Sequence, residues 1–111
     1  MTTGDNAKKA VAEALNGVLA DSFALYLKTK NFHWHVSGPH FRDYHLMFDD
    51  QAAQILATTD LIAERVRKNG HRTLTSIGEI ARRQSISDND DAKVAAAAML
   101  EELHSDNLKL V

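Results

Sequence analysis

Five side chains in the segment 31–64 have the chemistry and the spacing of metal ligands: His33, His45, Asp49, Asp60 and Glu64. His45 and Asp49 are four residues apart, and Asp60 and Glu64 repeat that spacing. Residues four apart on an α-helix lie one turn up and about 40° round, so each pair presents two ligands on one face. Imidazole and carboxylate groups bind borderline and hard divalent metals, and the chain has no cysteine. The pattern therefore predicts a metal site built on helices.

The two pairs share a helix face but are too far apart to share an ion within one helix. Asp49 and Asp60 are separated by about 1100° of rotation, which returns to within roughly 20° of the same face. The rise between them is about 16 Å, whereas metal–ligand bonds are about 2 Å long. The pairs are then unrelated, or belong to two sites, or meet across a two-fold axis near Gln54 and Ile55. We favour the third arrangement, an antiparallel second copy, because a self-complementary interface makes two equal sites.

His33 adds a ligand from the preceding helix. His33 and His45 lie on opposite sides of the Gly38-Pro39 turn at comparable distances from it, so a helical hairpin puts them at the same level. A single histidine is more often an ordinary core or surface residue. Five ligand-type side chains at these spacings on adjoining helices favour a site instead.

Two neighbours of the predicted ligands have possible supporting roles. Trp34 follows His33, and its indole either packs or donates an electron to a redox metal. Asp50 projects about 100° away from Asp49 and is either surface charge or a point of mineral nucleation facing an enclosed space.

The rest of the chain predicts an all-α antiparallel bundle in a single domain, residues 1–111. One proline and five glycines in 111 residues indicate long helices with few turns. We expect a helix from near Asp5 or Asn6 to the Ser37-Gly38-Pro39 turn, one from about Pro39 to Asn69, a short one from about Ile77 to Arg83 capped by Thr75 or Ser76, and a last one from near Asp90. A fourth long helix would complete the usual bundle, so we expect a chain truncated at its C-terminal end.

Composition excludes several classes of function. No apolar run is long enough for a membrane span or a secretory signal, so we expect no membrane partner. The net charge of −2 gives no general electrostatic reason to bind nucleic acid. The absence of cysteine fits a reducing cytosol.

The sequence resembles the Dps family, the miniferritins that bacteria use in starvation and oxidative stress. The resemblance rests on His33-Trp34, on the spacings from His33 to Glu64, and on the segment K-x-x-x-F-H-W-H-V-x-G-P-x-F at positions 28–41. It implies a ferritin-like bundle with a short helix in the connection between the second and third long helices, and with the C-terminal helix missing from this chain.

The resemblance also implies an activity. Members of the family oxidise ferrous iron with hydrogen peroxide, or with dioxygen, at a ferroxidase site between two-fold-related subunits, and store ferric mineral. The catalytic and metal-binding residues would be His33, His45 and Asp49 of one subunit with Asp60 and Glu64 of the other, holding two iron ions. A dodecameric shell in the cytoplasm, protecting the cell from oxidative damage, is implied as well.

The residues alone leave alternatives open. They do not choose iron over zinc or manganese. A nucleoid-associated protein that protects DNA with little ferroxidase activity is the main alternative, but only Lys8 and Lys9 lie near the N-terminus, so we expect DNA binding to be weak or absent. An inert helical interaction module would use the same His and Asp residues merely as polar interface groups.

Overall fold

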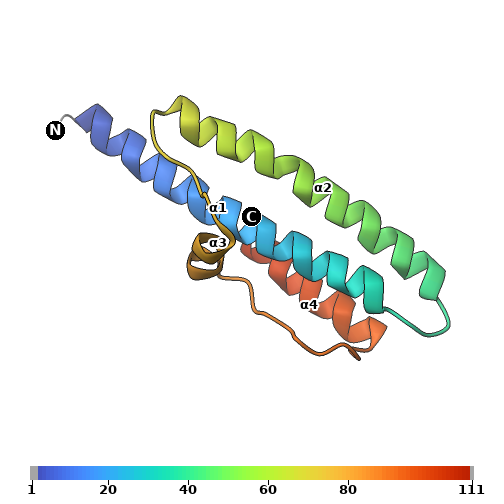
Figure 1. The fold of residues 1–111 in the computed structure, drawn as a ribbon. Helices are drawn as coiled ribbons and strands as arrows, with labels where there is room; N and C mark the ends of the chain where they lie inside the picture. Colours follow the sequence, from blue (N-terminus) through green and yellow to red (C-terminus); the bar gives the residue numbers. More distant parts are fainter. Residues whose placement is uncertain (1–2, 111) are drawn as a thin grey trace.

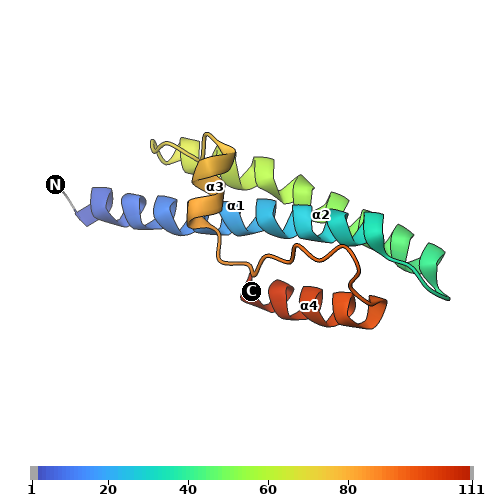
Figure 2. The same cartoon turned by 60° about the horizontal axis from the view of Figure 1, so that its bottom comes forward.

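A computed structural model describes residues 3–110, none of which lies in a β-strand. Four helices follow in order: α1 (Thr3–His35), α2 (Phe41–Lys68), α3 (Ile77–Arg83) and α4 (Ala96–Lys109). α1 and α2 lie side by side as an antiparallel hairpin, and α4 runs antiparallel to α1 (Figure 1). Figure 2 shows α3 lying across α1, with α4 beneath. The predicted all-α arrangement with a short helix in the connection before the last helix is confirmed.

α1 is the central helix of this arrangement. By length and composition Gly4–His35 could cross a membrane, although the sequence analysis expects no span. However, α1 contacts α2, α3 and α4, and buries side chains against them, among them Ala12, Leu19, Leu25 and Phe32. Its place in the core accounts for part of its apolar composition, while Val11, Val18 and Leu27 remain exposed.

The turn between α1 and α2 has the conformation expected from its sequence. Gly38 has φ 103°, which lies in the left-handed region that glycine adopts without steric cost. The Phe41 N–H donates to the Gly38 carbonyl at 3.1 Å, and α2 begins there, slightly later than the predicted Pro39. This tight turn aligns the end of α1 with the start of α2.

The core joins this hairpin to α4. Phe32 and Phe48 are fully buried, with ring centroids 6.5 Å apart. Around them pack buried residues from α1, the turn that follows it, the long connection and α4: Leu25, Val36, Ile86, Met99 and Leu103. Burial of side chains of this size is worth about 1.5–3 kcal/mol each. The histidines at the end of the hairpin therefore stand on a rigid base.

The long connection contains one correct and one incorrect helix prediction. α3 has the predicted bounds and the predicted cap, because the Ser76 hydroxyl accepts the Glu79 N–H at 3.1 Å. The predicted start of the last helix near Asp90 is wrong. The Asn89 side chain accepts the Asp91 N–H at 2.9 Å, and Asp91 accepts the Lys93 N–H at 2.8 Å. These residues form Asx turns instead of capping a helix, and α4 starts at Ala96.

The predicted start of the first helix is also slightly misplaced. α1 already includes Thr3, so Asp5 lies in its first turn and is not the cap. A carboxylate there interacts favourably with the positive end of the helix dipole. Met1 and Thr2 lie outside the described residues.

Candidate metal centre

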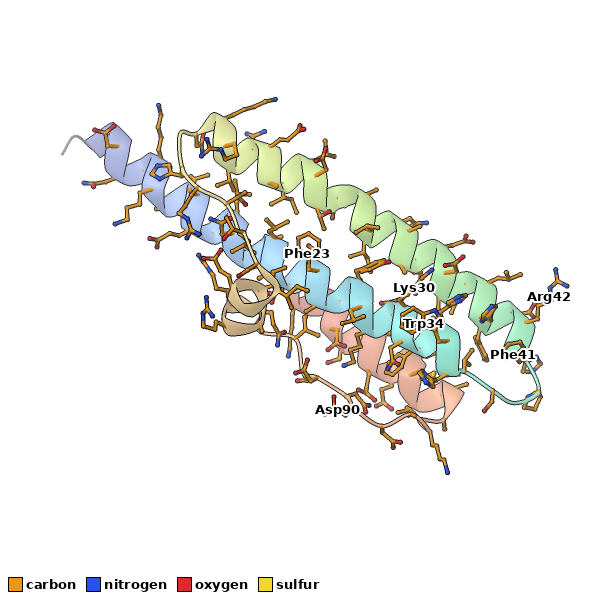
Figure 3. All side chains as sticks on the ribbon, in the orientation of Figure 1. Phe23, Lys30, Trp34, Phe41, Arg42 and Asp90 are labelled. Atoms are coloured by element: carbon orange, nitrogen blue, oxygen red, sulfur yellow. The ribbon has the colours of Figure 1, made fainter. Side chains whose placement is uncertain are left out.

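Two histidine rings lie face to face where α1 ends and α2 begins. His33 is in the last turn of α1, and His45 follows the first turn of α2. Their ring centroids are 3.8 Å apart and their planes differ by 21°. Phe41 also stacks with His45, with centroids 5.0 Å apart. This end of the hairpin is marked in Figure 3 by Lys30, Trp34 and Phe41. The hairpin thus brings the two histidines to the same level, as the sequence predicted.

Each histidine ring is hydrogen-bonded to the backbone of the other helix. His33 Nδ1 lies 2.5 Å from the carbonyl oxygen of His45, and His45 Nδ1 lies 2.7 Å from the carbonyl oxygen of His33. Because a carbonyl oxygen only accepts, both Nδ1 atoms carry the hydrogen and donate it. In a neutral ring the lone pair is then on Nε2, the atom left to bind a metal. The reciprocal bonds fix the tautomer and orientation of both imidazoles.

Asp49, one turn beyond His45 on α2, adds a carboxylate. Its Oδ1 atom is 3.9 Å from His33 Nε2 and accepts a short hydrogen bond from the Lys30 ammonium. That bond holds the pKa of Asp49 below its ordinary value of 3.8 and the pKa of Lys30 above 10.5. Asp49 is consequently a carboxylate at neutral pH. Three of the five predicted ligands thus lie near one another in one chain, although within residues 3–110 they do not converge as a complete metal-binding group.

The other two predicted ligands lie elsewhere on the same helix. Asp60 and Glu64 are both exposed. Asp60 lies about 16 Å beyond Asp49 along α2, and Glu64 lies one turn further. Within residues 3–110, no hydrogen bond or ion pair joins either carboxylate to another group, and no three His, Asp or Glu side chains of the single chain form a metal-binding group. Beside them Leu56 and Leu61 are exposed by 40% and 69%. This stretch of α2 therefore presents unpaired carboxylates together with apolar surface.

The two residues with predicted supporting roles are both on the surface. Trp34 is 56% exposed although its neighbour His33 is largely buried. Asp50 is exposed and lies next to the half-exposed Asp49. Both side chains are accessible, and each remains a prediction in its role.

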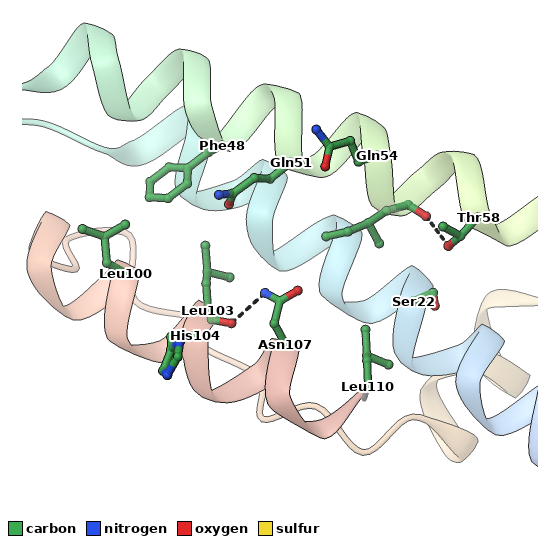
Figure 4. A pocket seen from close by; sticks show the side chains of 11 residues that line it. Ser22, Phe48, Gln51, Gln54, Thr58, Leu100, Leu103, His104, Asn107 and Leu110 are labelled. Carbon is green, nitrogen blue, oxygen red and sulfur yellow. Dashed lines mark hydrogen bonds between the residues drawn. The ribbon is translucent and has the colours of Figure 1, made fainter.

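A groove of the described structure lies away from these residues. It has a volume of about 600 Å³ and runs between α2 and α4, with Phe48 and Gln51 on one wall and Leu100 and Leu103 on the other (Figure 4). Among its lining residues only His104 has a side chain of a type that commonly binds metal. The groove is therefore an apolar feature of the helix packing and lacks the ligand set of the hairpin.

Lys30 is the residue at this centre that the sequence analysis missed. Its Nζ donates to Asp49, one turn from His33 on α1. The hairpin register contains a signal for it. Lys30 is three residues before His33 on α1, and Asp49 is four residues after His45 on α2. Because the two helices are antiparallel, these positions lie opposite each other. Pairing the helices in this way would have placed Lys30 against Asp49.

Known proteins resemble this chain over nearly its whole length. Residues 12–111 match the ferritin-like domain family. A low temperature-induced protein of Nostoc sp. is 32% identical over 107 residues, which cover 96% of this chain and 60% of that protein. A DNA protection during starvation protein of Brevibacillus brevis is 31% identical, over 94% of this chain and 69% of that one.

A solved structure gives the same result. The crystal structure of a Dps protein from Bacillus brevis superposes with a TM-score of 0.89 at 29% identity, covering 98% of this chain and 71% of that chain. This chain spans about 60% of the length of the Nostoc relative. The domain match, the relatives and the superposition agree with the helix order and the hairpin described above. The chain belongs to the Dps family of ferritin-like proteins.

Proposed function

We propose that this chain oxidises ferrous iron and stores the ferric product, at a site completed by a second copy of the chain. The proposal rests on His33 and His45, whose tautomers and ring orientations are fixed by their reciprocal hydrogen bonds. Both have Nε2 free, and the Asp49 carboxylate is within 3.9 Å of His33 Nε2. Histidines that only pack in a core do not require a fixed tautomer with Nε2 available, whereas a metal site requires neutral, oriented imidazoles.

The second half of the site comes from Asp60 and Glu64 of a neighbouring chain. An antiparallel copy of α2, related by a two-fold axis near Gln54 and Ile55, would set these carboxylates opposite His45 and Asp49. That contact would bury three exposed leucines of α2, Leu46, Leu56 and Leu61. Each pair of chains would contain two equal sites, and pairs would assemble further into a closed shell in the cytoplasm.

The donor set suits ferrous iron as the substrate. Two neutral imidazoles and three carboxylates give mixed nitrogen and oxygen ligation, which binds Fe²⁺ and leaves positions open. Two ferrous ions supply the two electrons that convert one hydrogen peroxide and two protons to two waters. Because both electrons are delivered together, no hydroxyl radical is released. The oxidised iron would then move towards carboxylates such as Asp50, and Trp34 would supply an electron when only one ferrous ion is bound.

The Brevibacillus relative suggests a second candidate, since its name refers to DNA protection. Under this alternative the chain would protect DNA mainly by binding it. A gel-shift series over increasing salt separates the two functions, because phosphate contacts give a steep salt dependence. We expect no retardation at physiological salt.

Peroxide consumption tests the proposal directly. Wild-type protein mixed with ferrous iron would use about one peroxide per two iron ions. The double variant Asp60→Ala/Glu64→Ala would fall to the rate of iron in buffer, while its helical circular dichroism stays unchanged. Glu101→Ala, which removes an exposed carboxylate from α4, is the control and would keep the wild-type rate. A wild-type rate in the double variant would contradict the proposal.

A further inference from the structure

A second lysine of α1 is surrounded by oxygen atoms on the opposite side of the helix from Lys30. The Lys28 Nζ atom is 2.8 Å from the Ser87 carbonyl oxygen, 2.7 Å from Asp106 Oδ2 and 3.2 Å from Glu102 Oε1. These oxygens come from the long connection and from two successive turns of α4. Three oxygens from two separate segments thus converge on a single positive charge.

This cluster is in the interior of the subunit. The side chains of Lys28 and Asp106 are only 6% and 5% exposed. Glu102 is more open, and its two carboxylate oxygens also accept hydrogen bonds from the Asn89 amide, at 2.9 and 3.1 Å. Lys28 and Asp106 form a buried ion pair at 2.7 Å.

We infer that the Lys28 ammonium fills a cation site inside the subunit and thereby keeps divalent metal out of it. Carboxylates on bundle helices that point inward are the usual way such folds build interior metal sites. Here two carboxylates and a carbonyl form a hard oxygen set, suited to Mn²⁺ or Ca²⁺. While the ammonium is present, its positive charge would repel a divalent ion and its volume would occupy the place of that ion.

For the proposed function, on which this role rests, the consequence is selectivity. Ferrous iron would be directed to the histidine face of α1, and none would be held where it could not reach oxidant or mineral. Lys28 would act as a specificity-determining residue at a distance from the reaction. Lys30, two residues further on, contacts only Asp49 among the described carboxylates, and its side chain is 27% exposed.

The test removes the ammonium and asks whether a metal takes its place. The background is the full chain with Asp60→Ala/Glu64→Ala, which leaves the proposed ferroxidase site incomplete; binding by its three remaining ligands is measured in the background protein alone. Lys28→Met in this background is titrated with Mn²⁺ by calorimetry, and its thermal unfolding is followed with and without the ion. We expect one additional Mn²⁺ per chain. At a hundredfold excess over Kd, Tm would rise by roughly 10 °C.

Three controls define the outcome. The background protein itself and its Lys8→Met variant, which removes an exposed lysine of α1 far from either site, would gain no such ion. Adding Glu102→Gln and Asp106→Asn to Lys28→Met would abolish the Mn²⁺ effect. If Lys28→Met is unfolded without metal, Mn²⁺ would restore its helical circular dichroism. Absence of both added binding and recovery in Lys28→Met, or equal Mn²⁺ binding by the background protein, would overturn the inference. A wild-type ferroxidase rate in Asp60→Ala/Glu64→Ala would instead remove the proposed function and leave this result standing.

Discussion

Asp106→Asn is expected to destabilise the protein far more than Glu102→Gln, although both carboxylates contact the same ammonium. Asp106 is 4% exposed, so its loss leaves Lys28 buried with one strong partner fewer. Removing one member of a buried ion pair costs about 3–5 kcal/mol. Because Glu102 and the Ser87 carbonyl still hold the ammonium here, we take a lower figure of about 2–3 kcal/mol. Glu102, whose side chain is 34% exposed, is expected to contribute less than about 1 kcal/mol.

Thermal unfolding followed by circular dichroism measures this difference. At fixed protein concentration, Asp106→Asn would lower Tm by roughly 10–20 °C, and Glu102→Gln by less than roughly 5 °C. Both substitutions preserve side-chain volume, so cavity formation does not enter the comparison. Equal losses in the two variants, or a loss for Asp106→Asn within error of zero, would refute the view that buried charge at this point holds α4 to α1.

Two further predictions concern charges on the surface. Lys30→Gln is expected to tighten binding of the first divalent ion, because it removes a cation that competes for Asp49; calorimetric titration with Co²⁺ would show it, and weaker binding would contradict the reasoning. Glu79→Gln is expected to lower Tm at neutral pH but not in acid. The Thr75 N–H and Arg72 hold the pKa of Glu79 below its ordinary value of 4.5, so its stabilisation is present above that pH and lost as the pH falls through the lowered pKa. A Tm difference that persisted unchanged at pH 2 would exclude this cause.

Local sequence signals were enough for the hairpin and for the short helix. The position of His33 against His45 follows from counting outward from a glycine turn, because antiparallel helices keep register over a few residues. Ser76 and Glu79 identify α3 because a cap and its partner are three residues apart. In both cases the interacting groups are close in sequence.

The remaining features depend on contacts between distant segments or between chains, which local sequence patterns do not predict. Asn89 and Asp91 are as suited to turns as to helix caps, and only the path of the connection decides between them. The Lys28 site needs α4 to cross α1 at one particular height, which the sequence does not specify. Asp60 and Glu64 need a second chain altogether, so their role remains a prediction.

Mixing two inactive variants tests the shared site most directly. One chain carries His33→Ala/His45→Ala, and the other carries Asp60→Ala/Glu64→Ala. In a mixed two-fold pair, one site would have all five ligands and the other would have only Asp49 left. Random pairing of equal amounts, refolded together, would therefore restore about a quarter of the wild-type rate of peroxide consumption. A mixture no more active than either variant alone would contradict the head-to-tail site.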